Sequence, residues 1–130
     1  MDGSYTSSQK LKGVIMEKIM SQLFVESDKI DWEIVGEGVK RKILGYDDQL
    51  MMVVVQFDKG SIGYVHKHPH RQTTYLAKGK FEVQIGNKMK ILKEGDCYYI
   101  PPNVEHGVVC LEEGILIDVF NPHRKDFLKQ

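Results

Sequence analysis

The sequence predicts one all-β domain, an antiparallel sandwich or jelly roll, that follows a short N-terminal extension. Three observations predict this fold class: many short segments rich in β-branched or aromatic residues, polar turn signals between them, and the close spacing typical of hairpins. The chain has 130 residues, the size of a single domain with a substantial buried core. We place the boundary near residue 30, with the extension in residues 1–30 and the β domain in residues 31–130.

The extension is predicted to be partly helical. Its first residues are small and polar, whereas from Lys10 to about Val25 an apolar residue recurs every four positions. Residues with this spacing lie on one face of an α-helix, although Gly13 lowers the helix propensity of the segment. We therefore expect one short amphipathic helix that packs on the β domain or contributes to a dimer contact. The apolar positions are Leu11, Ile15, Ile19 and Leu23.

After Asp31 the sequence takes on the rhythm of strands. Turn signals separate the segments, and Gly86-Asn87 suits the tight primed turn of a β-hairpin. Lys78-Gly79 and residues 112–114 are predicted as two further turns. Strands joined in this way form two antiparallel sheets that enclose a cavity at one open end. The predicted strands are Val39–Leu44, Leu50–Phe57, Tyr64–Lys67, Thr73–Ala77, Lys80–Ile85, Lys88–Leu92, Cys97–Ile100, His106–Cys110 and Ile115–Phe120.

Composition restricts the partners and the compartment. Eighteen basic residues balance eighteen acidic ones, so nothing indicates nucleic acid or an anionic membrane as the main partner. Cys97 and Cys110 have neither metal-type nor redox-type spacing and are too few for a disulfide scaffold, which favours a reducing compartment. No apolar run approaches the ~20 residues of a membrane helix, and no secretory signal is evident. We expect a cytoplasmic protein with a small ligand.

Four residues with metal-ligand chemistry lie in two short segments. His66 and His68 are two positions apart, so on a strand their side chains point to the same face and can converge on one ion. Gln72 follows this pair, and His106 follows a proline-rich turn further along the chain. A lone histidine in a β protein is more often a hydrogen-bonded structural residue. Three imidazoles and one amide in this pattern instead favour a site for one divalent metal.

The last predicted strand carries a second polar group. Asp118 stands between two apolar residues and shares a strand face with Phe120. A buried carboxylate without a partner is costly, so Asp118 either meets solvent or lines a polar cavity. Arg124 follows nearby and suits either a cavity wall or a surface ion pair. Of the remaining histidines, His70 is interpreted as a residue that supports the ligands from behind or lies at the rim of the site, and His123 as a surface or rim residue.

The two metal-ligand segments resemble the paired signature motifs of the cupin superfamily, which implies a jelly-roll barrel around a metal site. Two departures are informative. Gln72 stands where the first motif commonly has glutamate, and Asn103 and Cys110 stand where the second commonly has glycine and asparagine. With Gln72 all ligands are neutral, so a bound ion keeps its full charge, which favours an anionic substrate and Lewis-acid chemistry over an iron dioxygenase. The motifs read Gly60-x5-His66-x-His68-x3-Gln72-x6-Gly79 and Gly95-x5-Pro101-x-Asn103-x2-His106.

Four segments carry a closer resemblance: Trp32–Gly45, His66–Gln72, Ile100–Val108 and Asp118–Arg124. Together they are similar to the pectin-degradation, KdgF-type cupins, from about residue 32 to residue 128. Members of that family linearise 4,5-unsaturated uronates, which pectate and alginate lyases release, to the open-chain 5-keto-4-deoxyuronate. The resemblance implies metal ligands at His66, His68, Gln72 and His106, and a catalytic acid/base, aromatic residue and arginine at Asp118, Phe120 and Arg124.

These residue types suit such a reaction. Ring opening removes a proton from the anomeric hydroxyl, releases the ring oxygen as an enolate and protonates C4, and Asp118 is a suitable proton shuttle. Arg124 offers a bidentate fork for the uronate carboxylate, and Phe120 would stack on the apolar face of the sugar. A cation with neutral ligands stabilises the charge that develops on oxygen. We expect one divalent transition metal, such as Zn, Ni, Fe or Mn, since this donor set accepts each of them.

Two other classes of function remain open from the sequence. One is a metal cupin with different chemistry, such as an oxygenase or another sugar isomerase. The other is a non-catalytic cupin that binds a small ligand. In each case the expected partners are a small molecule and a second copy of the chain, because cupins of this size commonly pair through an edge strand. An uptake of oxygen by iron-loaded protein would favour the first alternative, and a sealed apolar pocket the second.

Overall fold

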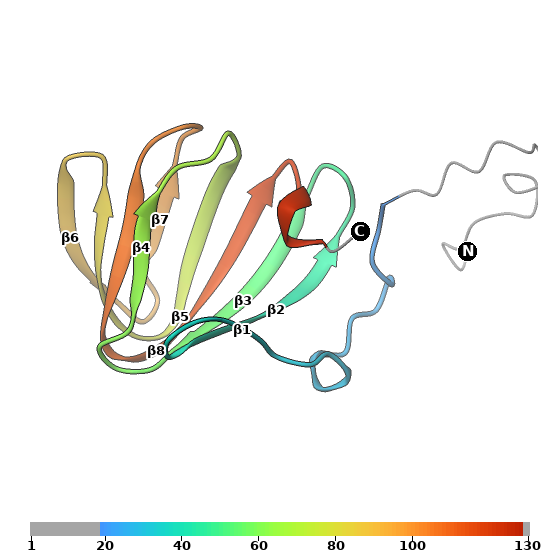
Figure 1. Cartoon of the computed structure of the whole chain (residues 1–130), viewed down its shortest axis with the longest axis horizontal. Coiled ribbons are helices and arrows are strands. Elements are labelled where there is room, and N and C mark those ends of the chain that lie inside the picture. The colour runs from blue at the N-terminus through green and yellow to red at the C-terminus, as the bar shows by residue number, and fades with distance from the viewer. Residues whose placement is uncertain (1–18, 129–130) are drawn as a thin grey trace, which may run out of the picture.

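Two long strands that bend in the middle organise the fold of the computed structural model, which describes residues 19–128 (Figure 1). Within these residues the regular structure consists of eight strands and two short 3-10 helices, η1 (Ser27–Lys29) and η2 (Lys125–Phe127). The strands are β1 (Glu33–Gly36), β2 (Val39–Tyr46), β3 (Met51–Phe57), β4 (Ile62–His66), β5 (Arg71–Ile85), β6 (Lys88–Lys93), β7 (Cys97–Ile100) and β8 (His106–Asn121).

The strands form one antiparallel sheet that bends back on itself. Its main path runs β1-β2-β3-β8-β5-β6, with β4 paired to β8 and β7 paired to β5. The first half of β5 pairs with β7 and its second half with β6, whereas β8 pairs first with β4 and then with β3. Because β5 and β8 also pair with each other, they connect the two halves of the sheet. The predicted antiparallel all-β fold is therefore confirmed.

The bends in β5 and β8 fall where the sequence predicts turns, and those two turn predictions are wrong. Gly79 lies within β5 with φ of +88°, and a Cβ there would be 2.5 Å from the carbonyl oxygen of Glu113. A Cβ at Gly114 of β8 would be 2.5 Å from the carbonyl oxygen of Lys78. The pairing register shifts here between Leu76 and Phe81. The glycines thus mark a corner where two continuous strands cross closely, instead of the ends of separate strands.

The region before the β domain differs from the prediction. The part of the predicted helix up to residue 18 lies outside the described residues, and Ile19–Val25 is not helical. Instead Met20 forms an isolated bridge with Asp47, and the backbone N–H of Ser21 donates to the carbonyl of Tyr46. These hydrogen bonds to the start of the domain replace those of a helix. Among residues 19–128, no helix is both long and apolar enough to cross a membrane.

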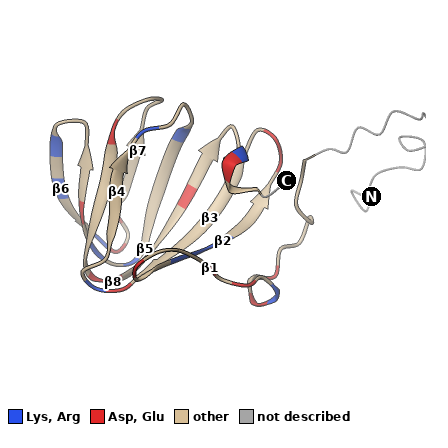
Figure 2. Ribbon diagram, in the orientation of Figure 1, with Lys and Arg blue, Asp and Glu red and all other residues tan. Residues whose placement is uncertain are grey.

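Alternating side chains on the inward faces of the strands build the core and one polar region within it. On β3 the residues at alternate positions from Met51 to Phe57 are buried, and Phe57 packs edge to face on Phe81 at 5.2 Å between ring centroids. On β8 the buried Leu116 and Phe120 flank Asp118 on the same face. Figure 2 shows an acidic segment within the arrow of β8 and a basic run along β2, with further charged segments at loops and turns. Asp118 is part of this polar region.

Candidate metal centre

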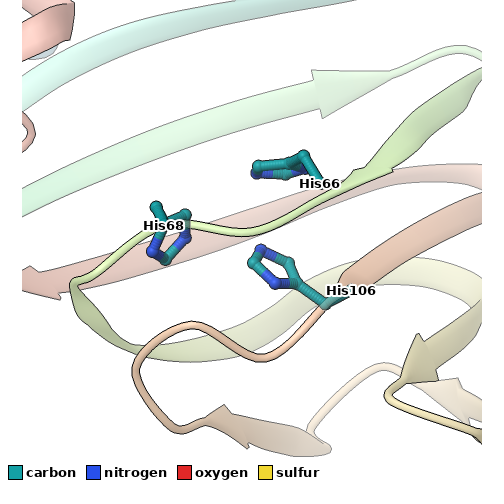
Figure 3. Close-up of side chains that lie close together, drawn as sticks. All are labelled: His66, His68 and His106. Atoms are coloured by element: carbon teal, nitrogen blue, oxygen red, sulfur yellow. The ribbon is translucent and has the colours of Figure 1, made fainter.

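Three histidines converge at one end of the sheet (Figure 3). His66 ends β4, His68 follows it in the loop, and His106 begins β8 in register with His66. One ring nitrogen from each lies within 4.8 Å of the others, and the ring centroids of His66 and His106 are 4.4 Å apart. The predicted strand Tyr64–Lys67 ends one residue earlier, so His68 reaches the cluster from a loop and not by strand alternation. The cluster is compatible with one metal ion.

Backbone carbonyls orient two of the rings. Nδ1 of His66 lies 2.8 Å from the carbonyl oxygen of Tyr64, and Nδ1 of His106 lies 2.9 Å from that of Val104. A carbonyl only accepts, so each Nδ1 carries the proton and each Nε2 keeps its lone pair. Nε2 of His106 is buried and has no hydrogen-bond partner among the described residues. Such an orphaned acceptor fits a metal ligand.

Burial also keeps these rings in the ligand form. Burial, with smaller contributions from the neighbouring rings of His66 and His68, lowers the pKa of His106 to about 4. Burial likewise lowers the pKa of His68, and the positive charge of Arg124 contributes to this lowering. Both imidazoles are therefore neutral at physiological pH, and only neutral imidazole can coordinate a metal.

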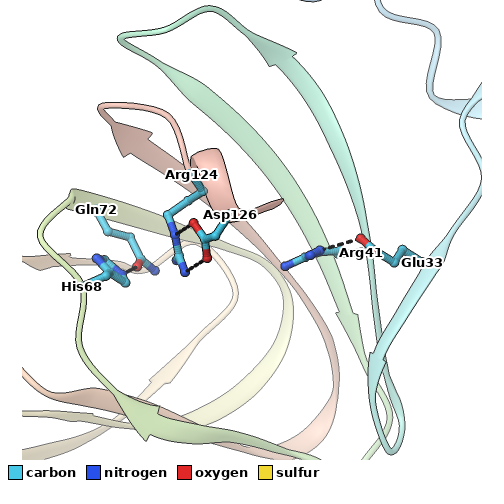
Figure 4. A network of polar contacts seen from close by, with 6 residues as sticks. All are labelled: Glu33, Arg41, His68, Gln72, Arg124 and Asp126. Atoms are coloured by element: carbon cyan, nitrogen blue, oxygen red, sulfur yellow. Dashed lines mark hydrogen bonds and ion pairs between the residues drawn. The ribbon is translucent and has the colours of Figure 1, made fainter. Parts of the chain in front are cut away.

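Gln72 presents its oxygen to the cluster. The side chain is buried, and its Oε1 lies 2.9 Å from Nε2 of His68 (Figure 4). Its Nε2 donates to Oγ1 of Thr74 at 2.9 Å and to Oδ1 of Asp118 at 3.3 Å, which fixes the orientation of the amide. Neighbouring ligands of an octahedral ion, each at about 2.1 Å from it, lie about 3 Å apart. The His68 to Gln72 separation thus fits two ligands of one ion as well as a hydrogen bond.

Asp118 is linked directly to this amide and lies in the wall of a cavity. Its Oδ1 also accepts a hydrogen bond from Oγ1 of Thr74 at 2.6 Å. Burial raises the pKa of Asp118 from its ordinary 3.8 to about 6, against the opposing effects of the Thr74 hydrogen bond and the charge of Arg124. A carboxyl group with this pKa can both take up and release a proton near neutral pH. The sequence allows Asp118 either to meet solvent or to line a polar cavity, and in the structure Asp118 lines the cavity.

The cavity has a volume of about 240 Å³. Its wall combines apolar residues of β3 and β8 with polar side chains. Every residue of the predicted site except His68 lies in its wall, and His68 contacts Gln72, which is one of the wall residues. A cavity of mixed polar and apolar lining suits a small polar molecule. The predicted residues in its wall are His66, Gln72, His106, Asp118, Phe120 and Arg124.

Arg124 is both a cavity residue and an ion-pair partner. Its Nε and Nη2 donate to the two carboxylate oxygens of Asp126 at 3.1 and 2.9 Å (Figure 4). The side chain is buried, and its guanidinium carbon lies 5.1 Å from the centre of the Phe120 ring and 4.2 Å from that of Phe127. Asp126 and the two rings therefore hold the guanidinium in place at the cavity.

Three residues that line the cavity or hydrogen-bond to a lining residue were not predicted from the sequence. Thr74 supports Asp118, and its position two residues after Gln72 on one strand is the signal that could have found it. Tyr98 lines the cavity, and burial together with the nearby charge of Asp118 raises the pKa of its hydroxyl. Arg41 also lines the cavity, and its alternation with apolar residues of β2 was the available signal.

The other two histidines lie beside the cluster. The His70 ring is 5.2 Å from that of His68 between centroids, but His70 is not part of the group whose ring nitrogens converge. Nδ1 of His123 lies 3.0 Å from the carbonyl oxygen of Asp48, at the loop between β2 and β3. His123 is buried there, so it is not a surface residue, and neither histidine belongs to the convergent group.

Comparison with known proteins gives the family. Residues 53–120 match the cupin domain family. The chain is 52% identical over 111 residues to the pectin degradation protein KdgF of Dickeya dadantii, a match that covers 84% of this chain and 100% of that protein. Among solved structures, an RmlC-like cupin from Shewanella frigidimarina is 44% identical, with a TM-score of 0.82 over 84% of this chain and 98% of the other. KdgF from Halomonas sp. is 37% identical, with a TM-score of 0.79 over 83% and 100%.

The two levels of resemblance seen in the sequence are both confirmed by these matches. The cupin match covers the strands that hold the histidines, Gln72 and Asp118, and the relatives named KdgF are covered over their full length. The chain therefore belongs to the cupin family, and within it to the family of KdgF pectin-degradation proteins.

Proposed function

We propose that this protein is a metal-dependent enzyme of pectin breakdown that opens the ring of 4,5-unsaturated uronates to give 5-keto-4-deoxyuronate. The relative from Dickeya dadantii is named as a pectin degradation protein and is matched over its whole length, which supports a role in the same process. The observation that carries the proposal is the contact between Asp118 and Gln72, because it joins a group able to move protons to a candidate metal ligand.

The donor set suits one divalent ion. We infer that Nε2 of His66, His68 and His106 and Oε1 of Gln72 would hold it. One ring nitrogen of each histidine converges with the others, Oε1 of Gln72 lies 2.9 Å from Nε2 of His68, and Nε2 of His106 lacks a partner among the described residues. When bound, such an ion would supply a positive charge undiminished by its neutral ligands, which stabilises negative charge on a sugar oxygen. Zn, Ni, Fe and Mn all fit this set of imidazoles and an amide.

The proton transfers of the reaction can be assigned to one residue. Ring opening is an isomerisation: the anomeric hydroxyl loses a proton, the bond between the anomeric carbon and the ring oxygen breaks, and C4 gains a proton. Asp118 as a carboxylate would accept the first proton and, as a carboxylic acid, return one to C4, so no net proton is exchanged. Its pKa of about 6 leaves both forms accessible near neutral pH.

Arg124 and Phe120 would hold the sugar next to Asp118. Two nitrogens of the Arg124 guanidinium already donate to Asp126, and its remaining N–H groups are available for an acidic sugar. Phe120 offers the apolar face of its ring in the same wall. Together these residues would fix the position of the anomeric hydroxyl and of C4 relative to the carboxylate.

The direct test follows the loss of the conjugated double bond. Purified protein is mixed with unsaturated monouronate prepared with a lyase, and the ultraviolet absorbance is followed before and after treatment with a chelator. We expect the absorbance to fall rapidly with metal-loaded protein, slowly after chelation, and rapidly again once the metal is restored. A rate equal to that of the sugar alone, with metal bound, would rule the function out.

A further inference from the structure

Arg41 is a charged residue at a position where the sheet otherwise presents apolar side chains to the cavity. On β2 it alternates with Val39 and Ile43, which belong to the core or pack against it. Its neighbour across the sheet is Val55 on β3, and the next residue in that row is Leu116 on β8, both buried. A guanidinium in such surroundings needs strong partners, because an uncompensated buried charge is costly.

Among the described residues, Arg41 donates a hydrogen bond from one edge of its guanidinium group, the edge that carries Nε. Nε of Arg41 donates to Oε1 of Glu33 on β1 at 2.9 Å, and the Arg41 side chain is only 16% exposed. The two terminal nitrogens form the opposite, forked end of the group, which matches the geometry of a carboxylate. In Figure 4 this end points away from Glu33, toward the side of the cavity where Arg124 and Gln72 lie.

The two guanidinium groups of the cavity wall are held in different ways. Asp126 engages Nε and Nη2 of Arg124 together, whereas the hydrogen bond between Arg41 and Glu33 involves Nε of Arg41. Both groups rest on the Phe127 ring, with guanidinium carbons 3.7 Å (Arg41) and 4.2 Å (Arg124) from its centre. The aromatic contact orients each cation and adds no negative charge. Each guanidinium therefore has one carboxylate partner, and the forked end of Arg41 lies opposite its contact with Glu33, where it can donate to an anion.

We propose that Arg41 binds the carboxylate of the acidic sugar and thereby sets the preference of the site for uronates over neutral sugars. This inference rests on the proposed function and deepens it. The bidentate contact that the sequence assigned to Arg124 belongs to Arg41, while Arg124 supplies single donors and positive charge beside Asp118. Glu33 keeps the fork aimed into the cavity, as a carboxylate partner fixes a guanidinium in one orientation.

The test compares an acidic sugar with its neutral ester on metal-loaded protein. kcat/KM is measured for the unsaturated monouronate and for its methyl ester, with the wild type and with Arg41→Gln and Arg41→Lys. We expect Arg41→Gln to lower kcat/KM for the acid by about tenfold to a hundredfold, in line with the loss of charged hydrogen bonds, and to leave the ester unchanged. Arg41→Lys should retain part of the preference, since it keeps the charge without the fork.

Lys40→Gln is the matched control. Lys40 is the preceding residue on β2, its ammonium lies 4.7 Å from the centre of the Trp32 ring, and it lies outside the cavity wall. The control removes one positive charge from the same strand and should keep the preference for the acid. A thermal melt verifies that each variant is folded. If Arg41→Gln lowers kcat/KM for the acid and for the ester equally, or lowers neither value, Arg41 has only a structural role and the inference is wrong.

Calorimetry separates this inference from the proposed function. Titration of D-galacturonate and its methyl ester into the same variants measures the preference for the acid without turnover. Should the wild type fail to convert the unsaturated sugar yet bind galacturonate more tightly than the ester in an Arg41-dependent way, the function fails and the inference stands. If the wild type converts the unsaturated sugar but Arg41→Gln keeps the wild-type preference for the acid, the inference fails and the proposed function stands. Absence of any preference in the wild type defeats it as well.

Discussion

Gln72 and Asp118 share a set of hydrogen bonds that connects the candidate metal ligands to the candidate proton shuttle. Nε2 of Gln72 donates to Oδ1 of Asp118 at 3.3 Å and to Oγ1 of Thr74 at 2.9 Å, and that hydroxyl donates to the same carboxylate oxygen at 2.6 Å. With the nitrogen side of the amide so engaged, Oε1 faces His68. An amide can serve both neighbours because it has a donor end and an acceptor end, whereas a glutamate has only acceptors when ionised.

Gln72→Glu is therefore expected to impair the site although carboxylates are good metal ligands. It would replace a donor beside Oδ1 of Asp118 with a second negative charge, which raises the pKa of Asp118 further. It would also offset part of the charge of the ion. We expect metal content to be retained and kcat/KM for the unsaturated uronate to fall by about tenfold to a hundredfold.

Gln84→Glu is the control for that change. Gln84 lies on the same strand, its Nε2 donates to the carbonyl oxygen of Gly86 at 3.2 Å, and it is not in the cavity wall. This variant adds the same charge and should keep wild-type kinetics. Activity of Gln72→Glu equal to that of Gln84→Glu would show that the amide is not needed beside Asp118.

Asp118→Asn should abolish ring opening and yet stabilise the metal-free protein at neutral pH. The pKa of Asp118 is raised by burial to about 6, so the native state binds its proton more tightly than the unfolded state does. For such a group the free energy of unfolding falls as pH rises from about 4 to about 6, at a total cost on the order of 1 to 3 kcal/mol. An asparagine carries no charge at any pH and avoids that cost, while its oxygen still accepts from Thr74.

Urea unfolding of the metal-free wild type and of Asp118→Asn, at pH 4 and pH 8, measures this effect. We expect the variant to gain stability relative to the wild type at pH 8 and to gain little at pH 4. Activity is measured in parallel on metal-loaded protein, together with Asp118→Ala, which should keep the fold and the metal and lose turnover. Retained turnover in either variant would remove Asp118 from its role as acid/base.

His106→Ala should lose metal, and His70→Ala should keep it. His106 belongs to the convergent group and its buried Nε2 has no partner among residues 19–128, whereas His70 lies beside the group without joining it. Elemental analysis after dialysis measures the occupancy of each variant, with a loss of about tenfold or more in affinity expected for His106→Ala. Equal occupancy in the two variants would contradict the assignment of His106 as a ligand.

Much of the candidate site could be predicted because its signals are local. His66, His68 and Gln72 lie within seven residues of sequence, and His106 follows a recognisable proline turn, so spacing alone brings them to attention. The path by which His68 reaches the cluster differs from the prediction, since it lies beyond the end of β4. A loop and a strand can present the same residues to one point, and spacing does not distinguish them.

Arg41 and Thr74 could not be assigned in the same way, because their roles depend on contacts between distant segments. Arg41 faces the cavity only through the pairing of β2 with β3, and Thr74 meets Asp118 only through the register of β5 with β8. Strand β1 was also missed, since its four residues are mostly exposed and show no alternation of apolar and polar side chains. Long-range register is set by the whole core, which no local pattern reports.

The two wrong turn predictions lead to a stability test of the corner in β5. Gly79 and Gly60 both have φ of +88°, but a Cβ at Gly79 would meet the carbonyl oxygens of Glu112 and Glu113 at 2.6 and 2.5 Å, whereas a Cβ at Gly60 has nothing within 4 Å. Gly60→Ala should therefore cost only the conformational penalty of a left-handed residue, about 1 to 2 kcal/mol. Gly79→Ala carries the same penalty and a backbone clash, for a total of about 4 kcal/mol or more, or failure to fold.

Urea unfolding of the two alanine variants beside the wild type measures the difference between them. The backbone oxygens at Gly79 belong to β8, which pairs with both β3 and β5, so the clash cannot be relieved by the movement of one flexible side chain. We expect the clash to separate β5 from β8 at the corner and to disturb the pairing that brings Thr74 to Asp118. Equal losses of stability in Gly79→Ala and Gly60→Ala would mean that the strands do not cross closely there, and that Lys78-Gly79 is an ordinary turn after all.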